Sequence, residues 1–266
     1  MSPSHYPAPL RPDRTAVIVP LVGGDVAALR AECALVADQP TGVVDLVEWR
    51  VDRFADAAAR GSYAAGLAAI EEHLPGVPIL ATYRTPAEEG QPDLRPDPAA
   101  ESPDVPAAYV RLVAALAAEP AIALVDVERS HSLAAEAMAA CTAAGTPVVL
   151  SEHHFEGPLT ATEASEAFEN MAAAGASVAK LAIMPGSPAD VTALMDATAR
   201  AAAHSPVPLI AIAMGELGRI TRVGAPAFGS AATYCTVAAA SAPGQVPAAE
   251  ARAAVDALSA SLGTRA

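Results

Sequence analysis

Ser-Val-Ala-Lys-Leu-Ala-Ile-Met (residues 177–184) is a strand-like segment that is apolar on both of its faces, apart from Ser177 at its start and one cation, Lys180. Such a segment is typical of a strand in a parallel sheet that is buried on both sides. Lys180 is also the only lysine among 16 cationic side chains, the rest being arginines. An amine that must lose its proton to act fits this position, because guanidinium stays protonated whereas a desolvated ammonium can be deprotonated. The alternative is a lysine whose ammonium reaches water at the strand end.

Seven further runs of this kind occur along the chain, separated mostly by alanine-rich stretches of helical length. The alternation predicts parallel strands covered by helices. Eight repeats in about 250 residues match an α/β fold of one domain, the (β/α)8 TIM barrel. A doubly wound open sheet is the alternative, because a strand count does not prove closure. The predicted strands are Thr15–Leu21, Val43–Val51, Pro78–Arg84, Ala121–Glu128, Pro147–His154, Ser177–Met184, Pro208–Met214 and Phe228–Val237, and the predicted helices include Asp25–Asp38, Ala55–His73, Ser132–Ala144 and Ser187–Ala203.

Local signals refine the element boundaries. Thr160 and Glu163 have the spacing of a capping box, and Pro247 suits the first turn of the last helix. The Pro- and Asp-rich segment 92–106 predicts a loop before the next helix. The connection 215–227 is short and has room for at most a brief helix.

Composition limits the possible functions. No run of about 18 apolar residues is present, so we expect a soluble protein without a membrane span. The net charge of −14 argues against nucleic acid or an anionic membrane as a partner, and an anionic substrate would need a local cationic pocket. Cys33, Cys141 and Cys235 are odd in number and far apart, which favours reduced thiols in the cytoplasm. We expect residues 1–13 to form a loosely ordered tail and residues 14–266 to form the barrel.

Polar side chains gather at the C-terminal ends of the predicted strands, where a parallel α/β fold has its active site. Because side chains alternate along a strand, residues two apart share a face and can point into the same barrel mouth. Each residue also has a simpler interpretation. A strand-end ion pair contributes about 0–1 kcal/mol when it is exposed, and a single histidine is more often structural than catalytic. The strand ends concerned are Glu48-Trp49-Arg50, Thr82-Tyr83-Arg84, Asp126-Val127-Glu128, Ser151-Glu152-His153 and Lys180.

A lysine and a histidine on neighbouring predicted strands favour imine chemistry. Lys180 would attack a carbonyl, the protonated imine would draw electrons from a carbanion at the adjacent carbon, and His153 would move protons. His153 and His154 are adjacent, so a regular strand sends them to opposite faces and they cannot ligate one metal together. No dinucleotide fingerprint, Walker lysine or metal-ligand spacing occurs. We therefore expect neither a metal nor a cofactor.

Seven motifs follow one another in the order found in a known enzyme family: Glu-Trp-Arg-Val-Asp (48–52), Thr-Tyr-Arg-Thr-Pro-Ala-Glu (82–88), Ser-Glu-His-His-Phe (151–155), Ala-Lys-Leu-Ala (179–182), Met-Gly-Glu-Leu-Gly-Arg-Ile-Thr-Arg (214–222), Phe-Gly-Ser (228–230) and Ser-Ala-Pro-Gly-Gln (241–245). Through them the chain resembles the type I 3-dehydroquinases. The resemblance implies a (β/α)8 barrel that dehydrates 3-dehydroquinate, an anionic cyclic hydroxy-keto acid, to 3-dehydroshikimate in the shikimate pathway of aromatic amino-acid biosynthesis. It further implies a covalent imine without metal or nucleotide, and a homodimer.

By motif position, the resemblance implies a role for each site residue. Lys180 would form the imine, His153 would be the general acid and base, and Glu88 would orient and charge that histidine. Two groups of residues would bind the substrate: Glu48 and Arg50 at the ring hydroxyls with Arg84 beside them, and Arg222, Ser241 and Gln245 at the carboxylate. The connection 241–245 would close over the substrate and protect the imine from water, or it is a plain turn into the last helix.

The chain departs from the family pattern at three positions. Glu89 follows Glu88 where two glycines are common, and the spacing from Arg84 favours Glu88 as the functional carboxylate. His154 stands where many members have aspartate, which alters the charge beside His153. Pro20 stands where some members have serine, which removes one possible contact to a substrate hydroxyl.

Two rival functions fit parts of the same pattern. A class I aldolase would share the lysine and the barrel, but it normally needs a phosphate pocket near strands seven and eight, where this chain has Arg222 and Ser-Ala-Pro-Gly-Gln. A non-catalytic barrel that binds a cyclic hydroxy acid would not need His153 and Glu88.

Overall fold

The computed structural model describes residues 6–54, 63–89, 105–157, 159–237 and 244–262. Its parallel strands follow the order β7-β6-β5-β4-β3-β2-β1-β8-β9, so consecutive strands from β1 to β7 are neighbours. A parallel bridge between Leu209, in β7, and Ser230, just before β8, closes the sheet. The Ala231 amide donates to the Leu209 carbonyl at 2.7 Å. The eight main strands are β1 (Ala16–Leu21), β2 (Leu46–Arg50), β3 (Ile79–Thr82), β4 (Ile122–Glu128), β5 (Val148–His154), β6 (Val178–Ile183), β7 (Leu209–Ala213) and β8 (Ala232–Thr236).

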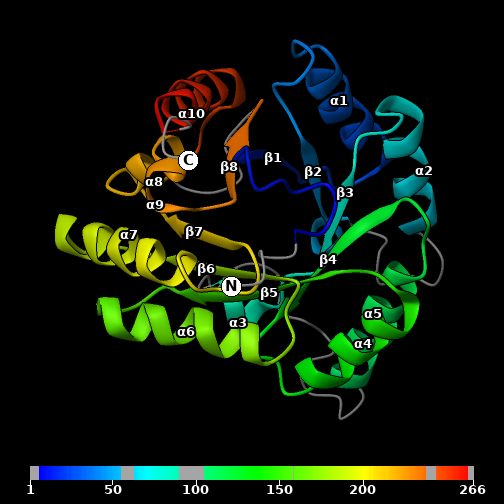
Figure 1. Cartoon of the computed structure of the whole chain (residues 1–266). Coiled ribbons are helices and arrows are strands. Elements are labelled where there is room, and N and C mark those ends of the chain that lie inside the picture. Colours follow the sequence, from blue (N-terminus) through cyan, green and yellow to red (C-terminus); the bar gives the residue numbers. More distant parts are fainter. Residues whose placement is uncertain (1–5, 55–62, 90–104, 158, 238–243, 263–266) are drawn as a thin grey trace.

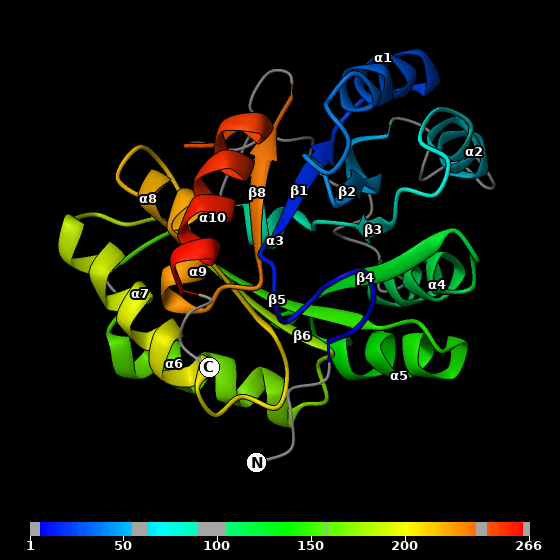
Figure 2. The same ribbon diagram turned by 45° about the horizontal axis from the view of Figure 1, so that its top comes forward.

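Helices surround the curled sheet on its outer side (Figures 1 and 2). The predicted single-domain barrel is confirmed, and the doubly wound alternative is wrong because the sheet curls until β7 meets β8. The long helices are α1 (Val26–Ala37), α2 (Tyr63–His73), α4 (Val105–Ala117), α5 (Ala134–Ala144), α6 (Ala161–Ala173), α7 (Pro188–Ala202) and α10 (Ala248–Leu262), and the short elements are η1 (Val51–Arg53), α3 (Pro86–Glu89), α8 (Arg219–Val223), α9 (Ala225–Phe228) and β9 (Val246–Pro247).

The element boundaries follow the predicted signals with three corrections, the first being that the connection 215–227 holds two short helices, α8 and most of α9, instead of at most one. Thr160 and Glu163 form the predicted capping box at the start of α6. Pro247 directly precedes α10 instead of lying in its first turn. The last predicted strand begins too early, because Phe228 ends α9 and Gly229, with φ +83°, terminates that helix in the left-handed conformation. The helix predicted from residue 55 and the loop predicted at 92–106 begin outside the described residues.

Two apolar clusters explain why the strands are apolar on both faces. Alternate strand residues such as Val47, Trp49 and Leu181 point outward and pack under the helices. The residues between them point inward and fill the barrel, as Leu46, Leu80 and Leu124 do. This inner layer forms the floor on which the polar residues of the mouth stand.

The N-terminal segment contacts this floor. Leu10 is 4% exposed and belongs to the inner cluster, with Tyr6 packed against it. The division into a tail (1–13) and a barrel (14–266) stays a prediction. Cys33, Cys141 and Cys235 are buried free thiols. None of the helices in the described part of the chain combines the length and apolarity that a membrane crossing requires.

Candidate active site

The inward positions next to the apolar floor carry polar side chains on five neighbouring strands. Strand alternation predicts this layer directly, because each of these residues lies two positions after an inward apolar residue. Two residues later on three of these strands, Arg50, Glu128 and His153 point to the same side as the layer. Arg84 follows the end of β3. The layer comprises Glu48, Thr82, Asp126, Ser151 and Lys180, and the pocket above it is lined by Pro20, Glu48, Arg50, Thr82, Arg84, His153, Lys180, Ala182, Ile212, Met214, Arg222, Tyr234 and Gln245.

The Lys180 amine ends inside this pocket. Lys180 is 5% exposed, and its Nζ lies 3.6 Å from Asp126 Oδ2 and 3.8 Å from Glu48 Oε1. The same nitrogen lies over the Tyr234 ring, 4.5 Å from its centroid. The structure therefore excludes the alternative in which the ammonium reaches bulk water at the strand end.

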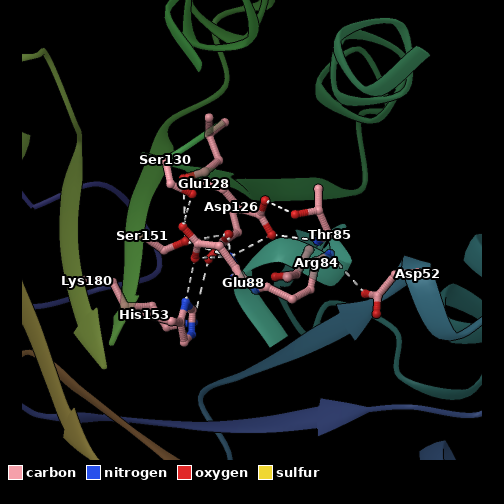
Figure 3. A network of polar contacts seen from close by, with 12 residues as sticks. Asp52, Arg84, Thr85, Glu88, Asp126, Glu128, Ser130, Ser151, His153 and Lys180 are labelled. Carbon is pink, nitrogen blue, oxygen red and sulfur yellow. Dashed lines mark hydrogen bonds and ion pairs between the residues drawn. The ribbon is translucent and has the colours of Figure 1, made fainter. Parts of the chain in front are cut away.

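His153 and Glu88 form a pair beside the lysine (Figure 3). His153 Nδ1 lies 2.8 Å from Glu88 Oε2, and Ser130 Oγ donates to Glu88 Oε1 at 2.5 Å. Burial, followed by the positive charges of Arg84 and Lys180, lowers the pKa of His153 well below its usual value. Burial raises the pKa of Glu88 to about 7, against the opposing effects of Arg84 and Ser130. When Glu88 is ionised, Nδ1 donates to it and Nε2 is the basic nitrogen of a neutral imidazole.

Arg84 joins three strands at the centre of the network in Figure 3. Although burial alone would lower the pKa of Arg84, the surrounding carboxylates raise it above its usual range. This guanidinium is thus committed to organising the protein's own acidic groups. Its side chain donates to Asp126 Oδ1 at 2.8 Å, Ser151 Oγ at 3.0 Å, Glu88 Oε2 at 3.3 Å and Glu128 Oε1 at 3.3 Å.

Glu48 and Arg50 leave β2 toward the same pocket. Glu48 is 5% exposed and accepts a hydrogen bond from Thr82 Oγ1 at 3.0 Å. Arg50 donates to both carboxylate oxygens of Asp52, at 2.9 and 2.7 Å. Asp52 also accepts from the Arg84 amide at 3.2 Å. The bidentate bond fixes the plane of the Arg50 guanidinium.

Arg222 and Gln245 border the pocket from the opposite side. Arg222, on α8, is 1% exposed and donates to the Tyr234 carbonyl at 3.0 Å. Burial lowers the pKa of Arg222 to about 10, so an anion nearby would favour its charged form. Ser241 lies outside the described residues. Next to Gln245, a Cβ on Gly244 would lie 2.1 Å from the Gly215 carbonyl oxygen, so only glycine fits there.

The sequence prediction and the structure agree on which residues meet, and two neighbours of Lys180 were missed as site residues. The sequence identifies Asp126 only as a polar residue at a strand end. Its strand is next to that of Ser151, and this inward position was the available signal that Asp126 lies near Lys180. Tyr234 gave no signal, because a tyrosine in a strand is ordinary in a core. Glu88 contacts His153, and the predicted site residues that line the pocket are Lys180, His153, Glu48, Arg50, Arg84, Arg222 and Gln245.

The structure also places the three departures from the family pattern, of which Pro20 lines the pocket. Glu88 is the carboxylate that contacts His153, as its spacing from Arg84 indicated. His154 Nε2 lies 2.5 Å from Glu152, which also pairs with Arg129, so it faces away from this pocket's acids. Among the described residues, no group of three or more His, Cys, Asp or Glu side chains is arranged to hold a metal ion.

Comparison with known proteins identifies relatives along nearly the whole chain. Residues 17–261 match the family model described as type I 3-dehydroquinase, which is the family that the motifs predicted. A 3-dehydroquinate dehydratase of Listeria monocytogenes serotype 4b is 36% identical over 244 residues, 91% of this chain and 92% of its own. A 3-dehydroquinate dehydratase of Klebsiella pneumoniae is 32% identical over 92% of this chain and 94% of its own.

Solved structures of the same class have the same fold. The 3-dehydroquinate dehydratase of Geobacillus kaustophilus superposes with a TM-score of 0.81 at 32% identity, covering 92% of this chain and 91% of its own. The type I enzyme of Clostridium difficile, solved with covalently modified comenic acid, gives a TM-score of 0.82 at 25% identity, covering 93% and 94%.

Proposed function

Because the chain belongs to the type I 3-dehydroquinase family, we propose that it dehydrates 3-dehydroquinate to 3-dehydroshikimate through an imine on Lys180. The observation that carries the mechanism is the position of the Lys180 amine. It is buried between Asp126, Glu48 and the Tyr234 ring, in the same pocket as a histidine held neutral by its surroundings. An enclosed amine can form and keep an imine that water would otherwise hydrolyse.

The chemistry divides into bond changes that the pocket residues can serve. The neutral Lys180 amine adds to the substrate ketone, one proton is taken up and water leaves, which gives a protonated imine; hydrolysis of the product imine later returns that proton. Loss of a proton from the adjacent carbon places electrons in the imine, and departure of the hydroxyl group with a proton forms the ring double bond. Addition of water to the imine then releases the product and restores the amine. The net change is loss of one water from the substrate.

His153 is the proposed carrier of these protons. Burial and the neighbouring cations keep the imidazole neutral, so Nε2 can take a proton at neutral pH. Glu88 holds Nδ1–H and stabilises the imidazolium when it forms. Asp126 and Glu48 balance the positive charge that Lys180 carries both as ammonium and as protonated imine.

The same pocket can bind the rest of the substrate. Arg222 and Gln245 are the proposed partners of its carboxylate, with Ser241 as a further predicted contact. Glu48 and the fixed guanidinium of Arg50 are the proposed partners of its ring hydroxyls. Arg84 lines the pocket, and its proposed role is to hold the carboxylates that it binds more than to contact the ring hydroxyls itself. The connection 241–245 closing over the site stays a prediction.

Borohydride reduction with 3-dehydroquinate, followed by intact-protein and peptide mass spectrometry, tests the imine. Lys180 is the only lysine, so the α-amino group is the only other primary amine that could be trapped. We expect one adduct, on the Lys180 peptide, and its loss together with turnover in Lys180→Met. Near-normal turnover in Lys180→Met would refute the mechanism.

The same assay separates the two rival functions. A class I aldolase would turn over sugar phosphates instead of 3-dehydroquinate. A non-catalytic binding barrel would bind the hydroxy acid for hours without forming product. Binding without product, in a sample whose Lys180 reacts with borohydride and ligand, would favour the second rival.

We also propose that the enzyme is a cytoplasmic homodimer that needs no metal or cofactor. The buried free thiols and the net charge of −14 are consistent with that setting. Light scattering after gel filtration reports the oligomeric state. Turnover that survives extensive dialysis against a chelator would support the absence of a metal requirement.

A further inference from the structure

Tyr234 has a buried hydroxyl without a hydrogen bond. The residue lies in β8, is 6% exposed, and its Oη has no hydrogen-bond partner among the described residues. Leaving a buried hydroxyl unsatisfied costs about 1–3 kcal/mol. Native structures rarely keep such a group without a function. The hydroxyl therefore indicates a partner that is absent when the pocket is empty.

The position of Tyr234 indicates what that partner is. Its side chain lines the pocket, and its ring face lies 4.5 Å from the amine nitrogen of Lys180. Tyr234 pairs in register with Ile18 of β1, and Pro20 is the next residue of that strand on the same face. Pro20 also lines the pocket, but its ring offers no donor. On this side of the pocket, a ligand oxygen near Lys180 would meet the tyrosine.

The electrostatic surroundings fix the chemical role of this hydroxyl. Burial, followed by the negative charges of Glu48 and Asp126, raises the pKa of Tyr234 well above its usual value. The group stays protonated, so it acts as a donor and not as a base. The Glu48 carboxylate is close enough to favour the protonated hydroxyl, as a weak side-chain hydrogen bond would, but the two groups do not reach the geometry of a full hydrogen bond.

We propose that the Tyr234 hydroxyl donates a hydrogen bond to the oxygen on the substrate carbon that Lys180 attacks. This oxygen is the ketone oxygen at first and the hydroxyl of the tetrahedral adduct afterwards. The bond would strengthen as negative charge grows on that oxygen during attack, so it would promote imine formation. The inference rests on the proposed dehydratase function and adds a residue to it.

Tyr234→Phe removes the hydroxyl and keeps the ring that lies against Lys180. We expect two changes of opposite sign. Without ligand, the midpoint of thermal unfolding should rise, because an unsatisfied buried hydroxyl is gone. With 3-dehydroquinate, kcat/KM should fall by about 10-fold or more, and borohydride trapping should slow by a similar factor. A structural role of the hydroxyl would lower stability and activity together, and that result would overturn the proposal.

Tyr109→Phe is the matched control. Tyr109 is also a buried tyrosine, 4% exposed, but its oxygen accepts a hydrogen bond from the Glu128 amide at 3.2 Å. This variant should therefore lose stability where Tyr234→Phe gains it. If wild-type protein turns over 3-dehydroquinate and Tyr234→Phe does so equally well, the inference fails alone. If wild-type protein gives neither turnover nor a trapped adduct, the proposed function fails first.

Discussion

The two sides of the barrel mouth differ in how their buried polar groups are paired, although each side has a buried oxygen without a hydrogen bond: Asp126 Oδ2, which lies 3.6 Å from Lys180 Nζ, and Tyr234 Oη. On the β3–β5 side, Arg84 binds several carboxylates, and these in turn bind hydroxyls and His153. On the β7–β8 side, the Tyr234 hydroxyl is unsatisfied, and burial lowers the pKa of Arg222 to about 10. The first side is organised before any ligand arrives, which suits proton transfer. On the second side, an anionic ligand with several oxygens would supply a partner for the Tyr234 hydroxyl and favour the charged form of Arg222. That arrangement suits binding.

The largest expected effect separates the two buried arginines. Arg84→Met leaves Asp126, Glu128 and Glu88 without their common cation, so we expect the free energy of unfolding to fall by about 3–5 kcal/mol. Arg222→Met should change it much less, because burial already disfavours that charge. Urea unfolding followed by circular dichroism measures both. Equal losses for the two variants would break the comparison.

An exposed arginine provides the control for that experiment. Arg200 pairs with Asp196 on the surface of α7, where its side chain is 71% exposed. Exposed pairs of this kind contribute about 0–1 kcal/mol. Arg200→Met should therefore leave the unfolding curve nearly unchanged, and a loss as large as that of Arg84→Met would mean that charge removal itself is responsible.

The second prediction removes the proton carrier from the organised side. His153→Ala should lower kcat by about 10²–10⁴-fold, because it removes the proposed general acid and base of the reaction. Lys180 would still be present, so borohydride should still trap an adduct. His204→Ala, at an exposed histidine, is the control and should behave like wild type. Loss of trapping with loss of turnover would instead assign His153 to the positioning of the lysine.

The third prediction tests the binding side. Without Arg222 the substrate carboxylate loses a charged donor, so Arg222→Met should lower kcat/KM by about 10–100-fold, mostly through KM. A ligand without the carboxylate should bind both proteins equally. Isothermal calorimetry with such a pair of ligands checks this. A loss in kcat alone would contradict a binding role and would move Arg222 to the chemical step.

The contrast between the two sides also explains what could be predicted from the sequence. Strand alternation predicts that residues two apart, such as Glu48 and Arg50, share one face and can point into the same barrel mouth. It predicts the fold for the same reason, since strands that are apolar on both faces need cover on both. Polar residues stand out in an apolar run, so the sequence was enough to predict the polar residues of the β3–β5 side.

What the sequence did not reveal depends on contacts between distant segments. Ser130 follows β4 and reaches Glu88 on α3, and no local pattern links the two. Tyrosine has an apolar ring and one polar hydroxyl, so its position in a strand predicts only that Tyr234 belongs to the core. Whether its hydroxyl finds a partner depends on which atoms of β1 and β2 lie opposite, and the residue types alone do not contain that geometry.

The smallest expected effect concerns the hydrogen bond from Ser130 to Glu88. We expect kcat/KM to rise with pH through about 7, because Glu88 must be ionised to hold His153 and burial raises the pKa of Glu88 to about 7. Ser130 donates to the ionised form and lowers that pKa, so Ser130→Ala should move the rising limb to higher pH, by about half a unit. The shift is small because Ser130 is exposed and water can replace its hydroxyl in part. Ser132→Ala, in the same turn and also exposed, is the control. A limb that stays in place, or that moves to lower pH, would show that Glu88 does not govern the acidic side of the profile.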